Sequence, residues 1–222
     1  MQIIARIHTD FKEKFGIPRQ SGLVHETRGV IVFEKSFRDP QALRGIEGYS
    51  HLWLLWQFSE SHTDTWHATV RPPRLGGNRR MGVFATRSPF RPNPIGLSSV
   101  RLLEVRATED RGHVLVVAGA DLLDGTPIYD IKPYLPFTDS HPDAIAGFAD
   151  GVLADGLRVV IPDDLAARIG TEHLPTVRAL LQQDPRPSYQ NDPTRIYGMS
   201  YADMAISFCV EGDTLTVTDV KA

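Results

Sequence analysis

Short apolar runs separated by turn-forming residues fill the first two thirds of the chain. The runs are rich in Val, Ile, Leu and aromatic residues, and clusters of Gly, Pro and Asp divide them. Such runs are typical of the short strands of an antiparallel barrel or sandwich. We therefore predict strands at Gln2–His8, Val30–Glu34, His51–Phe58, Met81–Thr86, Gly96–Val105, His113–Ala118 and Ile128–Ile131.

Two stretches of the chain have helical signals. Asp39-Pro40 is a helix-start signal, so one helical turn is predicted at Gln41–Ile46. From Pro162 to Gln183, apolar residues recur at roughly helical spacing, with breaks at Gly170 and Pro175. This second stretch predicts an interrupted helix.

The pattern changes after Pro142, and the end of the chain predicts a small α+β unit. Ala205–Val210 and Thr214–Val220 are strand-like runs that flank Glu211-Gly212-Asp213, a hairpin signal. We place a boundary near residues 142–157. The predicted fold class is mainly β, with a β-rich domain at residues 1–145 and a small α+β C-terminal domain at residues 157–222.

Composition narrows the setting in which the protein works. Of the 222 residues, 41% are hydrophobic and 23% are charged, as in ordinary globular proteins. The single cysteine, Cys209, excludes an internal disulfide and fits a reducing compartment. The N-terminal stretch lacks the apolar core of a signal peptide, and no run of ~18 apolar residues could span a membrane. We expect a cytoplasmic protein with no membrane partner.

The charge is distributed unevenly along the chain. The net charge is −3, yet no Asp or Glu occurs between Thr65 and Leu103. Because a local patch governs attraction to polyanions, this segment matters more than the total charge. Its arginines are Arg71, Arg74, Arg79, Arg80, Arg87, Arg91 and Arg101.

Most familiar catalytic signatures are missing. There is no G-x-G-x-x-G or G-x-x-x-x-G-K-[ST] motif, so neither a Rossmann fold nor a phosphate-binding P-loop has support. The sequence also has no G-x-S-x-G and no C-x-x-C. His62 and His67 have the wrong spacing for H-E-x-x-H, and ordinary histidines explain the pattern better than zinc ligands do. We expect no metal.

The most informative stretch runs from Arg71 to Val100. Its prolines and glycines hold arginines on stiff, shaped loops around one central strand. A guanidinium group offers bidentate hydrogen bonds to phosphate and stacks on bases. The segment therefore favours a nucleic-acid or phosphorylated substrate, and the alternative is a solvated basic loop that satisfies nearby acids.

A second polar cluster runs from Asp121 to Tyr134. Asp124-Gly125 indicates a turn, after which Asp130, Lys132 and Tyr134 alternate onto one strand face. Polar groups beside a turn could bind a small polar ligand. A charged hairpin edge explains the same residues equally well. The three tryptophans are better explained as core or stacking residues than as a cofactor-binding motif.

These segments together resemble the TrmO family (TsaA-like, formerly YaeB) of tRNA adenosine N6-methyltransferases, over nearly the whole chain. The long segment rich in arginine, proline and glycine carries most of the resemblance. In the last strands the chain departs from the family pattern, with Ala205-Ile206-Ser207-Phe208 in place of an Asn-Val-x-Trp-like run. The matching segments are Lys14–Gln20, Ser50–Trp53, Val70–Asn78, Met81–Gly96, Asp124–Pro127, Asp130–Pro136, Asp184–Tyr189 and Tyr197.

The resemblance implies an antiparallel β-barrel domain at residues 1–145 that binds S-adenosylmethionine, in place of the usual doubly wound methyltransferase fold. It also implies a C-terminal domain at 157–222 that assists with substrate, a homodimer, and methylation of N6 in N6-threonylcarbamoyladenosine at position 37 of tRNA. The implied cofactor-binding residues are Pro18, Arg19, Gln20, Ser59, Glu60, Arg87, Leu97, Asp124, Gly125, Thr126 and Pro127.

On this interpretation, the arginine-rich segment binds the anticodon arm of the tRNA. The residues assigned to RNA are Arg71, Arg74, Arg79, Arg80 and Arg91. The catalytic residues stay unassigned, with Asp130 and His51 as candidate general bases. The alternatives are an S-adenosylmethionine-dependent enzyme that acts on another RNA base or a small molecule, and a non-catalytic RNA-binding barrel.

Overall fold

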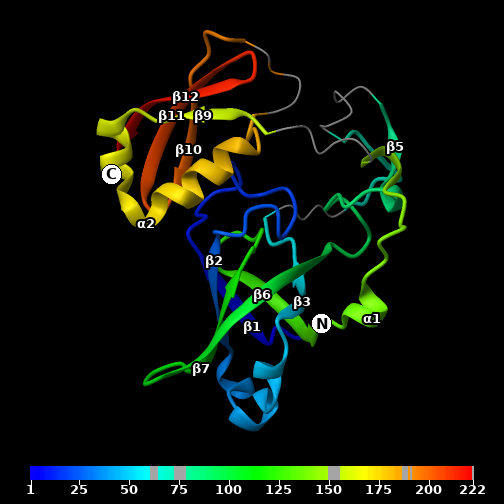
Figure 1. Cartoon of the computed structure of the whole chain (residues 1–222). Helices are drawn as coiled ribbons and strands as arrows, with labels where there is room; N and C mark the ends of the chain where they lie inside the picture. The colour runs from blue at the N-terminus through cyan, green and yellow to red at the C-terminus, as the bar shows by residue number, and fades with distance from the viewer. Residues whose placement is uncertain (61–64, 73–78, 150–155, 187–189, 191, 222) are drawn as a thin grey trace.

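A closed antiparallel barrel forms the first part of the computed structural model, which describes residues 1–60, 65–72, 79–149, 156–186, 190 and 192–221 (Figure 1). The strands close in the order β1-β2-β7-β6-β3-β8. Every neighbouring pair in the barrel is antiparallel. The strands are β1 (Ala5–Thr9), β2 (Arg28–Phe33), β3 (His51–Gln57), β6 (Ile95–Thr108), β7 (Gly112–Ala118) and β8 (Thr126–Pro133).

The barrel interior follows from strict alternation along the strands. In β3, Leu52, Leu54 and Trp56 are buried, whereas the residues between them are only partly covered. These side chains join Ile7, Ile31 and other apolar residues in one buried cluster. A period of two places alternate residues on opposite faces of a strand, so this pattern closes the barrel around an apolar core.

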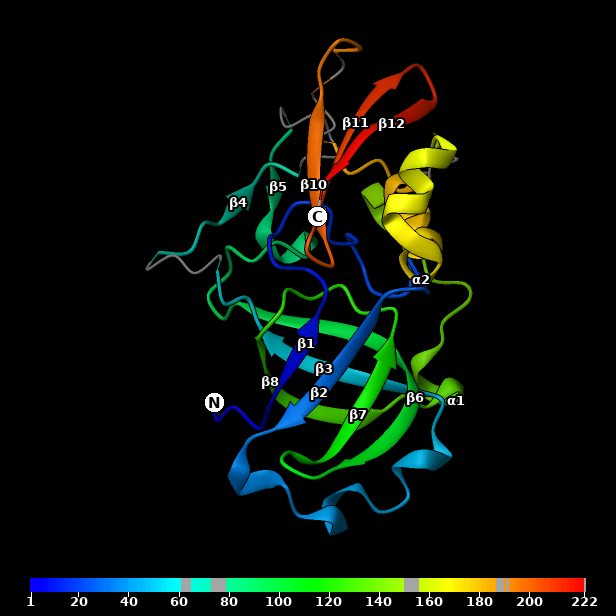
Figure 2. The same ribbon diagram turned by 90° about the vertical axis from the view of Figure 1, so that its left-hand side faces the viewer.

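Short elements close the two ends of the barrel. The 3₁₀ helices η1 (Lys35–Phe37), η2 (Pro40–Leu43) and η3 (Ile46–Gly48) lie together at one end, in light blue at the bottom of Figure 1. A two-stranded ribbon, β4 (Thr69–Val70) with β5 (Met81–Gly82), and the 3₁₀ helix η5 (Val83–Ala85) lie beyond the other end (Figure 2). The helix α1 (Pro136–Asp139) and the 3₁₀ helix η6 (Gly147–Ala149) follow β8.

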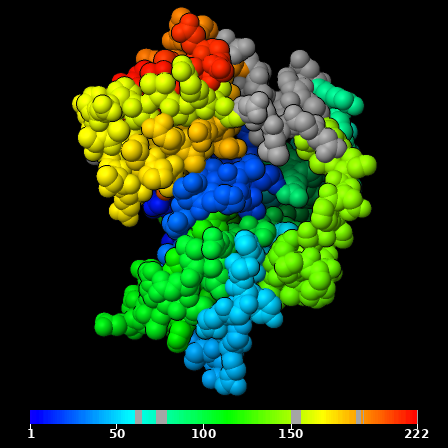
Figure 3. All heavy atoms as spheres, in the orientation of Figure 1, coloured from blue at the N-terminus to red at the C-terminus, as the bar shows by residue number. Residues whose placement is uncertain are grey.

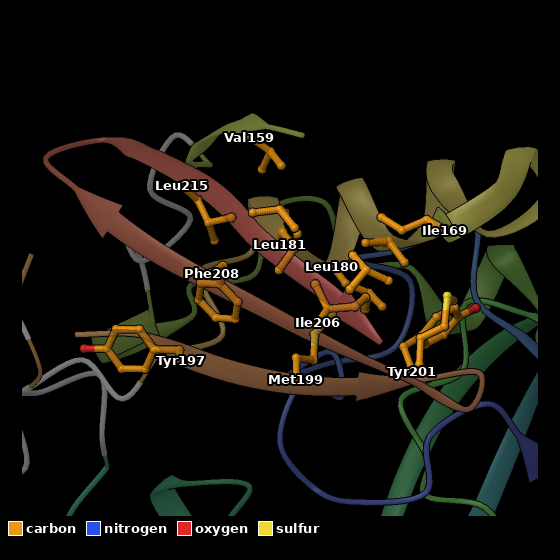
Figure 4. Close-up of a cluster of buried hydrophobic side chains, with 14 of the residues drawn as sticks. Val159, Ile169, Leu180, Leu181, Tyr197, Met199, Tyr201, Ile206, Phe208 and Leu215 are labelled. Carbon is orange, nitrogen blue, oxygen red and sulfur yellow. The ribbon is translucent and has the colours of Figure 1, made fainter. Parts of the chain in front are cut away.

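The C-terminal part is a four-stranded sheet covered by one helix. The strand order is β10-β11-β12-β9, and only β9 pairs in parallel. Side chains from α2 interlock with the sheet in a separate apolar core (Figure 4). The elements are β9 (Arg158–Val160), α2 (Asp163–Gln182), β10 (Tyr197–Tyr201), β11 (Met204–Glu211) and β12 (Thr214–Lys221).

A loop between β1 and β2 joins the two parts. Its Phe11 and Val24 are buried in the core of the C-terminal sheet, although both precede β2 in the chain. Glu13 accepts a hydrogen bond from the backbone N–H of Ser200, and Asp10 accepts one from that of Ala202. Figure 3 shows this blue segment lying between the yellow helix α2 and the green barrel.

The fold class predicted from the sequence is confirmed, with differences in detail. The predicted strand at Met81–Thr86 is wrong after Gly82, because Val83–Ala85 turn into a 3₁₀ helix that buries Val83. The pattern did not reveal β9 and β10. The predicted helix is α2, whose backbone leaves helical geometry at Gly170 (φ 80°), a conformation that glycine adopts without a Cβ penalty. The division at residues 142–157 stays a prediction, and residues 150–155 lie outside the described part of the chain.

Candidate functional site

A pocket of about 660 Å³ opens at the barrel end that faces the C-terminal sheet. The end of β3 and the start of β6 form the floor, with Trp56 and Phe58, and one wall, with Leu97. The loop from Ile17 to Gln20 forms a second wall, and the segment from Thr86 to Asn93 forms a third. The volume lies within the range of pockets that hold small organic ligands or cofactors, ~300–1,000 Å³.

The pocket floor depends on close contact between an indole and a glycine. Trp56 and Gly96 are opposite each other in the β3–β6 register, and the indole folds over Gly96. An ideal Cβ on Gly96 would lie 2.2 Å from Trp56 Cε2, a distance that real Cβ atoms essentially never show. The ring also packs against Phe58, with centroids 4.4 Å apart. Gly96 therefore fixes the position of the aromatic floor.

A hydrogen-bonded chain continues from this indole to a carboxylate. Trp56 Nε1 donates to Ser98 Oγ at 2.9 Å, and Ser98 Oγ donates to Asp121 Oδ1 at 2.6 Å. Burial raises the pKa of Asp121, and the hydrogen bonds from Ser98 and from the backbone of Asp121 and Ser21 oppose the rise. A largely buried carboxylate thus faces the pocket, where a cationic ligand group would be favoured.

The loop over the pocket is tied to the barrel at several points. Ser99 N donates to Ser21 Oγ at 3.1 Å, and Gly22 N donates to Gly119 O at 2.9 Å. Across the pocket, Arg87 donates to the side-chain oxygen of Gln20. Lys14 Nζ donates to the carbonyl of Glu60 at 2.6 Å. These contacts hold the pocket walls together.

The same loop also contacts the C-terminal part. Arg19 Nη2 donates to the carbonyl oxygens of Asp184 and Arg186, each at 3.1 Å. Gly16 lies against Met199, where an added Cβ would come within 2.5 Å of the side chain. The C-terminal sheet therefore helps to fix the loop that bounds the pocket.

Most of the residues predicted to bind a cofactor line this one pocket, although they come from distant parts of the sequence. The residues it gathers are Pro18, Arg19, Gln20, Ser59, Glu60, Arg87, Leu97 and Thr126. The predicted residues that the described pocket walls do not include are Asp124, Gly125 and Pro127. Their assignment stays a prediction.

The turn at Asp124 is occupied by contacts of its own. The Asp124 carboxylate accepts hydrogen bonds from Thr9 N and Lys12 Nζ, each at 3.1 Å. Desolvation acts to raise the pKa of Asp124, but the bonds from Lys12 and Thr9 outweigh it, so the pKa lies below its ordinary value. The backbone N–H groups of Asp124 and Gly125 donate to the carbonyls of Phe11 and Ile7. The turn therefore closes the barrel end beside Thr126.

The arginines predicted to bind RNA lie on and around the β4–β5 ribbon. Arg71, Arg79 and Arg80 are exposed, and Arg80 Nη1 donates to Thr69 Oγ1 at 3.0 Å. Arg91 lines the pocket and donates to the carbonyl of Thr86 at 3.0 Å. Arg74 lies outside the described residues.

The candidate general bases lie elsewhere. Asp130 pairs with Lys132 at 2.9 Å, and His51 Nδ1 is 2.9 Å from Ser50 Oγ. The pocket walls seen in the described residues include neither side chain. Sequence reasoning did not assign Ser98, Gly96 or Asp121 to the cofactor site, although Asp121 begins the polar cluster that was considered for a small polar ligand. One signal was available, because Ser98 is a polar residue at an inward-facing position of a strand.

Metal-ligand clusters and membrane spans are both missing from the part of the chain that the structure describes. Within those residues, no group of three or more His, Cys, Asp or Glu side chains could hold a metal ion. Among the described helices, none is long and apolar enough to cross a membrane. The residues that line the pocket offer aromatic surface, a partly buried carboxylate and guanidinium groups, which suit a ligand that has a flat ring system and charges of both signs.

Comparison with known proteins places both parts of the chain in one family. The model described as the tRNA-methyltransferase O N-terminal domain matches residues 6–140. The model described as the TrmO C-terminal domain matches residues 160–222.

Individual relatives agree with these matches. A tRNA (adenine(37)-N6)-methyltransferase of Escherichia coli K12 is 46% identical over 193 residues, covering 84% of this chain and 82% of its own. The "Putative S-adenosylmethionine-dependent methyltransferase RcsF" of Pseudomonas aeruginosa PAO1 is 42% identical over 227 residues, and the match covers 98% of this chain and 95% of that protein. A crystal structure of TrmO superimposes with a TM-score of 0.78 at 35% identity, covering 99% of this chain and 97% of the other.

Proposed function

This chain belongs to the tRNA-methyltransferase O family, and from that membership we propose that it is an S-adenosylmethionine-dependent tRNA (adenine(37)-N6)-methyltransferase whose donor binds in the pocket at the barrel end. The observation that supports this placement is the convergence on that pocket of predicted residues from five separate segments. The finer acceptor that we propose is N6-threonylcarbamoyladenosine.

The pocket fits the chemistry of this donor. The aromatic floor of Trp56 and Phe58 offers flat apolar surface to a ring system. Asp121 supplies negative charge at the floor, and Arg87 supplies positive charge at the wall. Because S-adenosylmethionine carries cationic groups, a carboxylate and an adenine ring, each of these groups has a complementary partner among the residues present.

The contribution of the protein to the reaction is mainly positioning. When bound, S-adenosylmethionine supplies a methyl group activated by its sulfonium charge. The loop from Pro18 to Gln20, held by Arg87 and by the segment that follows α2, fixes one side of the pocket relative to the strand that carries Gly96. Holding reacting atoms ~3–3.5 Å apart and aligned accounts for a large share of rate enhancement.

The arginines beside the pocket supply affinity for the RNA backbone. Replacing both Arg79 and Arg80 with alanine should weaken tRNA binding and reduce the slope of log affinity against log salt by about 1 for each phosphate that is no longer neutralised. Affinity for S-adenosylmethionine should stay unchanged, because neither side chain lines the described pocket. Filter binding across a salt series measures the RNA effect, and calorimetry measures donor affinity. An unaltered slope would show that Arg79 and Arg80 do not contact the phosphates of the RNA.

Arg87 is expected to act on the donor side. Its guanidinium lines the pocket and bonds Gln20 from the opposite loop. Arg87→Ala should lower S-adenosylmethionine affinity roughly tenfold to a hundredfold, since a charge-assisted hydrogen bond is worth about 1.5–3 kcal/mol. Calorimetric titration measures this, with exposed Arg101→Ala on β6 as the matched control. Wild-type affinity and turnover in Arg87→Ala would refute the placement.

One experiment separates the proposed function from its rivals. Mass spectrometry of tRNA nucleosides, from cells with and without this protein, should show loss of the N6-methylated form of N6-threonylcarbamoyladenosine. Loss of a different methylated base would show that this other base is the acceptor. Absence of any change, together with no heat on titration with S-adenosylmethionine, would favour a non-catalytic RNA-binding barrel. The homodimer and the cytoplasmic location stay predictions, and sedimentation and fractionation measure them.

A further inference from the structure

Large aromatic side chains are exposed beside the mouth of the pocket. Trp66 is 50% exposed and Phe84 is 72% exposed, and their rings stack with centroids 6.2 Å apart. The guanidinium carbon of Arg91 lies 6.0 Å from the centroid of the Phe84 ring. Three flat groups therefore form one exposed surface, which we term the aromatic platform.

Backbone contacts hold this platform in place. His67 N donates to Phe90 O at 3.5 Å, and Val83 N donates to Ala68 O at 3.0 Å. Val83, next to Phe84, is buried, and Thr86 N donates to Val83 O at 3.1 Å. Because both ring-bearing segments are fastened, the rings lose little freedom when a ligand covers them.

The platform is continuous with the pocket and lies in a basic environment. Arg91 belongs to both the platform and the pocket wall. Arg79 and Arg80 adjoin the platform through the β4–β5 ribbon, and no acidic residue occurs anywhere between Thr65 and Leu103. Aromatic faces combined with arginines are the means by which proteins bind unpaired bases of single-stranded nucleic acid.

We propose that Trp66, Phe84 and Arg91 form a stacking platform for an unpaired base of the anticodon loop that neighbours the methylated adenosine. This inference rests on the proposed function and adds a specific contact to it. By capturing a neighbouring base, the platform orients the loop so that the acceptor base enters the adjacent pocket. A single-stranded loop exposes base faces without the cost of opening a duplex.

Charge argues against a second copy of this chain as the occupant. If a two-fold axis passed through this patch, the patch would face itself and its unbalanced cluster of arginines would meet its own like charges. The phosphates of an RNA loop neutralise that cluster. The RNA is therefore the better match to both the aromatic and the charged parts of the surface.

The test compares two RNAs with the full-length protein: an unmodified anticodon stem-loop, and a blunt duplex with the same number of nucleotides. The double variant Trp66→Ala, Phe84→Ala should bind the stem-loop roughly tenfold more weakly or worse, since stacking on one base is worth that much. Its affinity for the duplex should change little. Arg79→Ala, Arg80→Ala should weaken binding of both RNAs. Tyr49→Ala is the matched control, because this exposed aromatic directly follows η3 and lies outside the described pocket walls.

A conservative variant separates the loss of the aromatic ring from a folding defect. Trp66→Phe keeps a ring, so it should bind the stem-loop with near wild-type affinity. It should also lose the part of the tryptophan emission change that Trp66 is expected to contribute when the loop is added to the wild type. Equal weakening of both RNAs in the alanine variant, or no weakening, would overturn the proposal. So would dissociation of a dimer with unchanged RNA affinity, which would make the platform a contact between copies.

Failure of the proposed function gives a different result. Stem-loop binding is measured without S-adenosylmethionine, so the platform can be confirmed even if no methyl group is transferred. Conversely, methyl transfer by a protein whose platform variants bind the stem-loop normally would leave the function intact and remove the platform.

Discussion

Replacing Gly96 with valine should abolish measurable binding of S-adenosylmethionine, a loss of more than about a hundredfold. Even a single Cβ at this position would lie 2.2 Å from the Trp56 ring, and the branched side chain adds two more carbons. The indole must then move, either into the pocket or against the barrel core. Either movement breaks its bond to Ser98 and removes the floor on which the donor would rest. Overpacking of this kind also costs about 1–3 kcal/mol of stability.

Calorimetric titration with S-adenosylmethionine and thermal unfolding test this expectation together. The matched control is Gly198→Ala in β10, because that glycine is also in a strand and has no atom within 4 Å of the added Cβ. A milder variant, Trp56→Phe, keeps the barrel filled while removing the indole N–H. If Gly96→Val is folded and binds the donor as the wild type does, the pocket at the barrel end is not the donor site.

Replacing Asp121 with asparagine should weaken S-adenosylmethionine binding roughly tenfold or more, which is the scale of a charge-assisted interaction in a buried site. Asparagine preserves the shape of the side chain but removes the negative charge that faces the pocket. S-adenosylhomocysteine, which lacks the sulfonium charge, should lose less affinity. Turnover at saturating donor should not fall in proportion, because stabilising the cation of the ground state does not lower the barrier.

The pH dependence of binding gives a second measurement of the same group. Burial raises the pKa of Asp121, and a bound cation favours the charged form and lowers that pKa again. Binding therefore releases a proton, and donor affinity rises as the pH rises through the raised pKa of the free protein. Asp121→Asn should lose this pH dependence.

Titrations in two buffers with different heats of ionisation measure the proton release directly. Asp110→Asn is the matched control, because that carboxylate pairs with Arg111 in the turn between β6 and β7, outside the described pocket walls. An Asp121→Asn protein with unchanged affinity for both compounds and an unchanged pH profile would exclude Asp121 from donor recognition. Its role would then be to hold Ser21 and Ser98 in place.

Much of the fold could be predicted because its signals are local. The apolar run His51–Phe58 predicted β3, which ends at Gln57, and Glu211-Gly212-Asp213 predicted the hairpin of β11 and β12. Local patterns failed where tertiary packing decided the backbone. Val83 becomes buried by turning into η5, so the predicted strand ends at Gly82. With three residues, β9 is too short to show a strand pattern in the sequence. It is a strand because it pairs with β12.

The candidate site, like the fold, could be predicted only in part. Motif resemblance indicated Pro18–Gln20, Arg87 and Leu97, and the barrel brings these residues to one pocket. No pattern in the sequence indicated that Asp121 would meet Ser98 and Trp56, or that Arg19 would reach the carbonyls of Asp184 and Arg186. Those contacts join residues that lie far apart in the chain.

By itself, the sequence determined the strand-rich first part, the helix and hairpin of the second, the family, and a basic segment free of acids. Apolar periodicity, turn residues and charge act over a few neighbouring positions, so they can be read without knowing the fold. The tertiary structure alone decided the pocket floor, the buried carboxylate and the bracing of the pocket loop by the C-terminal sheet. Each of these depends on strand register and closure between distant segments, which set the partners of a side chain only after the barrel has formed.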